Sequence, residues 1–272
     1  MKRSYHRRRR RYSGRKLRIY RISSRNPMGD IMTYKAKFLA NGQFLIPAGS
    51  SQTWYWSQFN NLNNFLSQLT TVPAAGGDVG MGFTDSTYPP GFDTWMNQFK
   101  QYRINGIKFR LTLENEGAVP QSVTVASTAT YTPYMGISFE GNSQGQSTTG
   151  VISNANYWHP AELKNNRWSR MKVIGQPQST RGRSTLQEFI SCAQLDPDYV
   201  ERQYSNQGTI TPNAPGTSPT FGGVTVAYNY GFCVGNLNGV ANTTGIDTYF
   251  TGYAEITLYM QVWNKNASVS IL

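Results

Sequence analysis

The chain has 272 residues, which is near the upper size of a single domain and is enough for a large hydrophobic core. Its formal net charge is +12, and that excess lies in one place. Residues 1–25 hold 12 Lys and Arg and no Asp or Glu, whereas residues 26–272 hold 14 residues of each sign. The sequence therefore predicts a cationic arm on a neutral body. This argues against a basic enzyme or a histone-like globule, whose positive charge would spread over the folded surface.

Cysteines and histidines are too few for several classes of protein. The chain has only Cys192, Cys233, His6 and His159, and the cysteines lie far apart in sequence. A zinc site, a CxxC redox pair and a disulfide framework are therefore excluded, and we expect no metal and no cofactor. No apolar run reaches the roughly 18 residues that a membrane span needs, so we expect no membrane insertion.

The predicted nucleic-acid-binding arm covers residues 1–29. Its cations repel one another and bury no apolar surface, so the arm is expected to be disordered in isolation. Arg outnumbers Lys ten to two, and guanidinium groups bind phosphate with two hydrogen bonds and stack on bases. Tyrosines among the cations can stack on unpaired bases, although they can equally be spacers. The predicted binding residues are Lys2, Arg3, Arg7, Arg8, Arg9, Arg10, Arg11, Arg15, Lys16, Arg18, Arg21, Arg25, Tyr5, Tyr12 and Tyr20.

The densest part of the arm has a second interpretation. The run Arg7, Arg8, Arg9, Arg10 and Arg11 is the kind of cluster that a nuclear import receptor reads, so we predict a nuclear localisation signal there. A tail lying on a membrane surface is disfavoured, because the arm lacks an amphipathic apolar face.

From Asp30 onward, short alternating segments separated by Gly, Pro, Asn and Ser predict an antiparallel β domain over residues 30–272. Strands are expected at 32–40 and 43–46, joined by a hairpin at Asn41-Gly42. Apolar residues at helical spacing then predict short amphipathic helices at 62–69 and 92–99.

The next strand is expected at 107–114, where Ile107 and every second residue after it are apolar and Lys108 and its alternates are polar. Ile104 lies out of phase with this pattern, and a bulge at Asn105-Gly106 would absorb the slip. Weaker strands are expected near 122–127, 169–175 and 184–192.

Two long Gly- and Ser-rich segments, 141–150 and 205–223, are interpreted as surface loops of one domain rather than as linkers between domains. Even-numbered apolar residues then predict strands at 224–234 and 253–263, each with one face in the core.

A catalytic constellation is not found, and no catalytic residue is assigned. Asp196 and Asp198 flank Pro197 and are interpreted as setting a turn, because no third ligand or partner base lies near them in sequence. His159 lies beside two aromatic residues and is interpreted as a packed or capping residue rather than as a general base.

Two segments, FKQYRI at 99–104 and YAEITLYMQV at 253–262, resemble parts of the capsid protein of circovirus-like, circular single-stranded DNA viruses. The sequence FKQYRI at 99–104, followed by GIKF at 106–109, is similar to that family's entry into an early strand. The sequence YAEITLYMQV at 253–262 is similar to its last strand. The resemblance implies an eight-stranded jelly-roll β-sandwich with short helices in its loops, forming an icosahedral shell with T=1 symmetry, about sixty copies, and an inward-facing arm.

The hypothesis is thus a non-enzymatic coat protein found in the virion, and in the host nucleus during assembly. Its partners would be copies of itself, a single-stranded DNA genome, a host nuclear import receptor and an unknown host-cell attachment factor. Two rivals stay open: the coat protein of an RNA virus, since the arm reads phosphates and not bases, and a cellular nucleic-acid chaperone with a β-sandwich domain.

Overall fold

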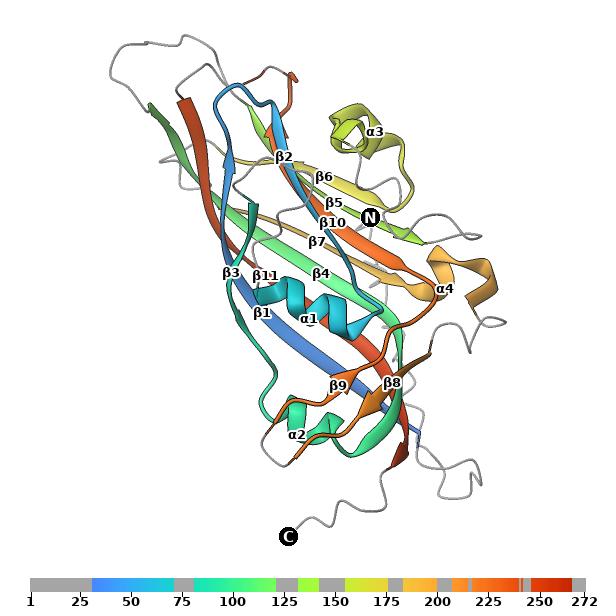
Figure 1. The fold of residues 1–272 in the computed structure, drawn as a ribbon. Coiled ribbons are helices and arrows are strands. Elements are labelled where there is room, and N and C mark those ends of the chain that lie inside the picture. Colours follow the sequence, from blue (N-terminus) through green and yellow to red (C-terminus); the bar gives the residue numbers. More distant parts are fainter. Residues whose placement is uncertain are drawn as a thin grey trace, which may run out of the picture.

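A computed structural model describes residues 31–70, 81–120, 132–141, 155–175, 183–199, 207–214, 217–239, 241 and 246–265. This part of the chain is built mainly of β-strands, with short helices in the connections (Figure 1). The strands are β1 Met32–Ile46, β2 Gln52–Gln58, β3 Met81–Thr87, β4 Phe99–Pro120, β5 Pro133–Gly141, β6 Ser169–Val173, β7 Arg183–Ser191, β8 Gln207–Thr211, β9 Thr220–Phe221, β10 Tyr228–Asn236 and β11 Ile246–Lys265. The helices are α1 Leu62–Thr70, α2 Phe92–Met96, η2 Ala155–Trp158, α3 Pro160–Asn165, α4 Cys192–Leu195 and η3 Pro197–Tyr199.

Eight of these strands pair as a jelly roll. The antiparallel pairs β1–β11, β2–β10, β4–β7 and β5–β6 join the first of the eight to the last, the second to the seventh, the third to the sixth and the fourth to the fifth. This is the order of one long hairpin rolled into two sheets. The larger sheet runs β1-β11-β4-β7 and the smaller runs β2-β10-β5-β6, and the larger one is extended by β3, β8 and β9. The predicted all-β, eight-stranded jelly-roll sandwich is confirmed.

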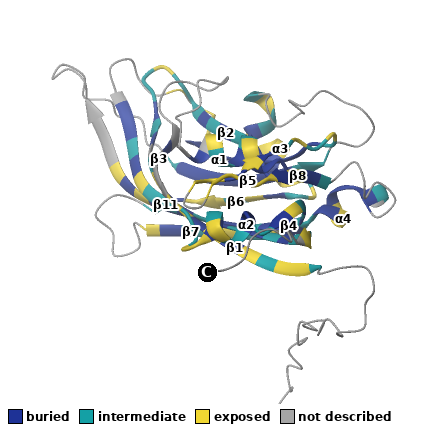
Figure 2. Cartoon of the chain, turned by 60° about the horizontal axis from the view of Figure 1, so that its bottom comes forward, coloured by how far each residue is buried: buried dark blue, intermediate teal, exposed yellow. Residues whose placement is uncertain are grey.

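The main core lies between the two sheets. Along β11 the even residues from Ala254 to Val262 are fully buried, and the intervening residues are partly exposed, as the sequence predicts. Figure 2 shows the same alternation of buried and exposed residues along β1. In β4 the register with β11 shifts between Ile104 and Gly106, so the predicted bulge is confirmed, with Asn105 as the extra residue.

The smaller sheet is covered on both faces. Every residue of β10 is buried, whereas the sequence pattern predicts one core face. A second cluster explains this difference, because Trp158 of η2 and Leu163 of α3 pack with Tyr134 and Cys233 on the side away from the main core. Large residues of β10 face the main core, and small ones face η2 and α3. At Gly231 a Cβ atom would come within 2.7 Å of the Trp158 ring.

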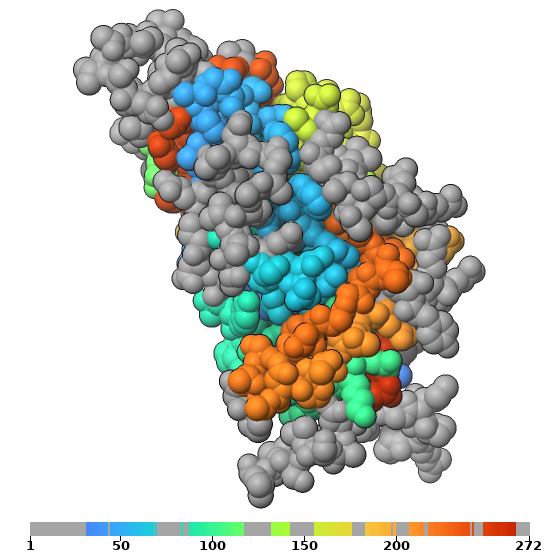
Figure 3. Space-filling view, in the orientation of Figure 1, coloured from blue at the N-terminus to red at the C-terminus, as the bar shows by residue number. Residues whose placement is uncertain are grey.

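Helix α1 confirms the predicted helix at 62–69. Its apolar residues Leu62, Phe65 and Leu69 are buried, and the Phe65 ring meets Phe38 of β1 edge-on at 5.1 Å. On the surface, α1 lies close to the segment between β9 and β10 (Figure 3). The second helix, α2, ends at Met96 because Phe99 already opens β4, so the predicted end at residue 99 is too late.

Three further expectations change or go untested. The hairpin at Asn41-Gly42 is wrong: β1 continues through these residues because it pairs with β11 along its whole length, and only its pairing with β3 shifts there. The segment 205–223 is not simply a loop, since β8 and β9 pair within it and bury Ile210 and Phe221. The expected strand near 122–127 and nearly all of the expected loop 141–150 lie outside the described residues, whereas β6 and β7 confirm the strands near 169–175 and 184–192.

Candidate nucleic-acid interface

The predicted binding arm joins the body at one end of the larger sheet. All fifteen residues assigned to nucleic-acid binding, including the five-arginine cluster, lie outside the described residues. The point of attachment is nevertheless defined, because Met32 at the start of β1 pairs with Val262 of β11. The arm therefore leaves the body at the end of the sheet where β11 finishes and β4 begins.

Next to that end, the larger sheet presents an outward side that we call the open face. It is formed by alternate residues of β1, β11, β4 and β7, from the row that contains Lys35 to the row that contains Arg183. Paired residues project from the same side of a sheet, so the strand register assigns each residue to this face.

Charge is unevenly distributed on this body. Residues 26–272 are neutral in total, but the open face carries five cationic side chains against two carboxylates. The cations are Lys35, Lys37, Lys108, Arg110 and Arg183, and the carboxylates are Glu114 and Glu255. A further carboxyl residue, Asp85 of β3, pairs with Asn41 at the edge of the sheet remote from β7. The open face is therefore a local positive surface on a neutral domain.

Glu255 organises the centre of the open face. Its two carboxylate oxygens accept hydrogen bonds from Lys37 Nζ at 2.8 Å and from Arg110 Nη1 at 3.0 Å. The hydrogen bond from Lys37, with that from Arg110, lowers the pKa of this carboxyl below its ordinary value. The single negative charge of Glu255 is thus shared between Lys37 and Arg110, and the open face keeps a net positive charge.

An aromatic pair lies beside these charges. The rings of Phe189 and Tyr259 meet edge-on at 5.2 Å, and Lys35 Nζ lies 5.3 Å from the centre of the Tyr259 ring. Gly106, which pairs with Tyr259, has no side chain, so the two rings meet across β4. A Cβ atom at this position would come within 2.6 Å of the Ile190 carbonyl oxygen. Phe189 remains 47% exposed, which is unusual for so large an apolar side chain.

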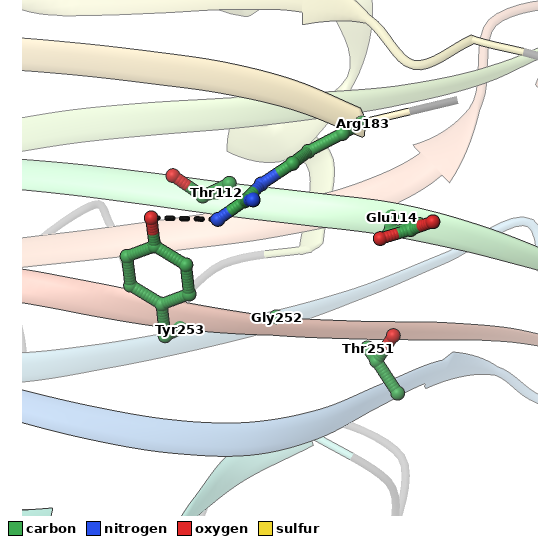
Figure 4. Close-up of a pocket in the computed structure, with 6 residues that line it drawn as sticks. All are labelled: Thr112, Glu114, Arg183, Thr251, Gly252 and Tyr253. Atoms are coloured by element: carbon green, nitrogen blue, oxygen red, sulfur yellow. Dashed lines mark hydrogen bonds between the residues drawn. The ribbon is translucent and has the colours of Figure 1, made fainter. Parts of the chain in front are cut away.

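At the other end of the open face lies a shallow hollow of about 290 Å³ (Figure 4). Arg183 crosses it and donates a hydrogen bond to the Tyr253 hydroxyl at 2.7 Å, with its guanidinium 5.2 Å from the ring centre. Thr112 and Glu114 of β4, with Thr251 and Gly252 of β11, form the rest of the wall. The hollow therefore also presents a cation and an aromatic ring together.

The residues weighed as catalytic candidates have structural roles. His159 is the N-cap of α3, and its Nδ1 accepts a hydrogen bond from the Ala161 amide at 3.4 Å, as the capping interpretation predicts. Asp196 lies in a turn, where its carboxylate accepts hydrogen bonds from the Asp198 amide at 3.0 Å and from the buried Tyr228 hydroxyl at 2.9 Å. Within the described ranges, no three His, Cys, Asp or Glu side chains gather as a metal site.

Both cysteines are buried free thiols, and burial raises the pKa of each one. They are thus held in the less reactive, protonated form. No helix among the described residues is both long and apolar enough to span a lipid bilayer.

Sequence reasoning missed the open face as a unit. The sequence pattern placed Lys108 and Arg110 on the polar side of one strand. That Lys35, Phe189 and Tyr259 lie on the same face is known only from the order in which the strands pair. The available signal was the alternation Lys35, Lys37 in β1 together with an apolar residue, Phe189, out of step with its polar neighbours.

No protein-family model matches the chain, and no curated protein matches it. Among solved structures, the chain is similar to the decameric BFDV capsid protein, with 13% identity, a TM-score of 0.39, and coverage of 86% of this chain and 100% of that one. For Desmodium yellow mottle tymovirus the identity is 10%, the TM-score 0.30 and the coverage 90% and 93%. For Macrobrachium rosenbergii nodavirus these values are 7%, 0.38, 91% and 61%. Because these scores are low, the jelly-roll assignment rests on the strand pairs of this chain.

Proposed function

We propose that this chain is the structural capsid protein of a circovirus-like virus, which assembles with copies of itself into a small icosahedral shell and packages single-stranded DNA. The observation that supports this most is a combination of two features: a jelly roll, and a 12-cation arm that joins it at the start of β1. Jelly rolls occur in capsids, lectins and cupins, so the fold alone does not choose among them. The arm favours a capsid, because an enclosed genome needs neutralising charge and a sugar or small-molecule site does not.

In this proposal residues 1–29 bind the genome and residues 30–272 form the shell. The arm's lysines, arginines and tyrosines contact phosphates and unpaired bases without reading sequence. The cluster from Arg7 to Arg11 also engages a host nuclear import receptor and takes the protein to the nucleus for assembly.

The body contributes the contacts between subunits. Strands β2 and β6 form the edges of the smaller sheet, and edge strands offer backbone hydrogen-bonding groups to a neighbour. Val173 at the end of β6 is 44% exposed and adds apolar surface there. A body without net charge suits a closed shell, since subunits of like charge would repel one another.

Electron microscopy and sedimentation of the purified full-length chain test the assembly. Closed particles of about sixty copies are expected. Particles with extractable nucleic acid that DNase removes and RNase spares support the proposal. RNase-sensitive contents would instead identify an RNA-virus coat, and a monomer or small oligomer under all conditions would favour the cellular chaperone.

A second experiment tests the arm. If 12 cations each displace a counterion from single-stranded DNA, log K against log salt should have a slope of about −8 for the arm. Replacing Arg7 to Arg11 with Ser removes five of these contacts and should flatten the slope by about 3.5. Particles of this variant should form but contain little nucleic acid, and its nuclear entry should weaken. Normal genome content in these particles would contradict the arm's role.

A further inference from the structure

We infer that the open face of the larger sheet is a second binding site for single-stranded nucleic acid, in which a base stacks against Phe189 and Tyr259 and the adjacent phosphates contact Lys35 and Lys108. This inference rests on the proposed function and adds a site on the folded body to the one in the arm.

Charge is the first argument. The three ion pairs among the described residues use Lys37, Arg110 and Arg170 as cations. Lys35 and Lys108 therefore have no carboxylate partner within that part of the chain. They lie on the open face in neighbouring rows of the sheet, on either side of Tyr259. Two ammonium groups without a carboxylate partner on one face of the sheet suit the phosphates of a nucleic-acid backbone.

The aromatic pair is the second argument. Burying a Phe side chain is worth about 1.5–3 kcal/mol, so a sheet face that leaves Phe189 exposed gives up stability. Of the other exposed large apolar residues, Met32 and Val173 lie at strand ends. Leu39 lies inside β1 and, like Phe189 inside β7, projects from the open face among polar residues. Rings that project beside cations form the stacking platform on which proteins bind unpaired bases.

The same features argue for nucleic acid over a second copy of the chain. A contact between two copies of the open face would bring five cations and two carboxylates against an identical set, and like charges would repel. A duplex is also disfavoured, because its bases are stacked inside and cannot lie on Phe189. Single-stranded DNA and single-stranded RNA share the required chemistry.

The arm supports this site by its point of attachment. Lys35 lies only four residues after Ile31, the first described residue. A single-stranded nucleic acid that the arm binds is thereby tethered next to the open face. This tether raises the local concentration of the nucleic acid there. The weak body site would then be filled even though the arm supplies most of the charge.

Photocrosslinking on the full-length chain tests the site directly. The probes are 5-iodouracil-containing oligonucleotides of single-stranded DNA, single-stranded RNA and duplex DNA, and peptide mass spectrometry reads the crosslinked residues. Crosslinks are expected at Phe189 or Tyr259 with both single strands, and the duplex should give at least fivefold fewer. Equal crosslinking by the duplex would overturn base stacking, and preference for one single strand would identify the sugar that the site favours.

A matched pair of substitutions sharpens the test. Phe189→Ser should reduce body crosslinks at least fivefold and leave arm crosslinks unchanged. Met32→Ser removes a similarly exposed apolar residue, which projects from the opposite side of the same sheet, and should change neither. Because both side chains are exposed, equal melting temperatures should confirm that both variants fold. If arm crosslinks appear without any on the open face, the inference is overturned and the proposed function stands; if neither appears, both fail.

Salt dependence gives an independent measurement. In the full-length chain, Lys35→Gln with Lys108→Gln should flatten the slope of log K against log salt by about 1.4 for single-stranded DNA, as two lost phosphate contacts predict. The control pair, Lys100→Gln with Lys164→Gln, removes two exposed lysines that lie off the open face and should leave the slope unchanged. Equal slopes for the two pairs would overturn the role assigned to Lys35 and Lys108.

Discussion

Strands β10 and β11 are both central in their own sheets, but their outer faces differ in side-chain size and in coverage. The outer side of β10 is small, with Asn229, Gly231, Cys233 and Gly235, and η2 and α3 cover it. The outer side of β11 carries large polar and aromatic side chains, and within the described residues no helix packs over it. In β10, large and small residues alternate, and the small side is covered by other parts of the chain. In β11, apolar residues alternate with polar and aromatic ones, and the polar and aromatic side stays partly exposed.

The largest expected effect separates these two outer faces with one kind of substitution. Trp158→Ala removes a fully buried side chain from the cover over β10 and should lower the free energy of unfolding by about 3–5 kcal/mol. Trp263→Ala removes a half-buried Trp of β11 from the side that bears the open face and should cost much less. Chemical denaturation of both variants measures the difference, and equal losses would contradict the distinction between the faces.

A smaller effect separates the two sides of β11 itself. Leu258→Ala should cost about 2–5 kcal/mol, because it leaves a cavity in the core between the sheets. Thr257→Ala changes the adjacent residue, which projects from the open face, and should stay within about 0.5 kcal/mol. Denaturation midpoints of the two variants provide the comparison, and similar losses would mean that the phase of β11 is misassigned.

The smallest effect is a pH dependence on the open face. Ion pairing lowers the pKa of Glu255 in the folded state, so its contribution to stability is present above the unfolded pKa and is lost as the pH falls through the folded pKa. Glu255→Gln should therefore lower the Tm slightly at pH 7, and the difference from the unaltered chain should shrink below about pH 4.3.

The control for this experiment is Glu114→Gln on the same face, because Glu114 takes part in none of the three ion pairs. Thermal melts at pH 7, 5 and 3 distinguish the variants. A Tm difference for Glu255→Gln that does not change with pH would show that the effect does not come from the carboxylate charge.

Local periodicity predicted strands well where one face meets the core and the other meets solvent, as in β11 and in β4 around its bulge. It failed where distant pairing overrides a local signal. Asn41-Gly42 has the sequence of a hairpin turn, but β1 stays extended there because its pairing with β11 continues through those residues. It also underestimated β10, because Trp158 and Leu163, which cover its second face, come from a part of the sequence about 70 residues away.

The candidate site divides in the same way. The arm could be predicted from composition alone, since twelve cations without an acidic residue favour a segment that binds anions, and its binding role stays a prediction. The open face could not, because its residues come from four strands whose neighbours are set by the jelly-roll order. Neutral total charge also concealed it, because the compensating carboxylates lie elsewhere on the body.

The pairing of β1 with β11 has a consequence for how the protein is made. Met32 pairs with Val262, so the larger sheet cannot close until the ribosome has synthesised the chain through β11. Contacts this distant in sequence fold slowly, and a chain stopped before β11 would expose the facing edges of both β1 and β4. The arm, by contrast, precedes β1 in the sequence, so its charge is present before any strand of the sheet is made. Completion of β11 thus decides when a nascent chain becomes a folded domain, and chains that lack this strand are exposed to proteases and chaperones.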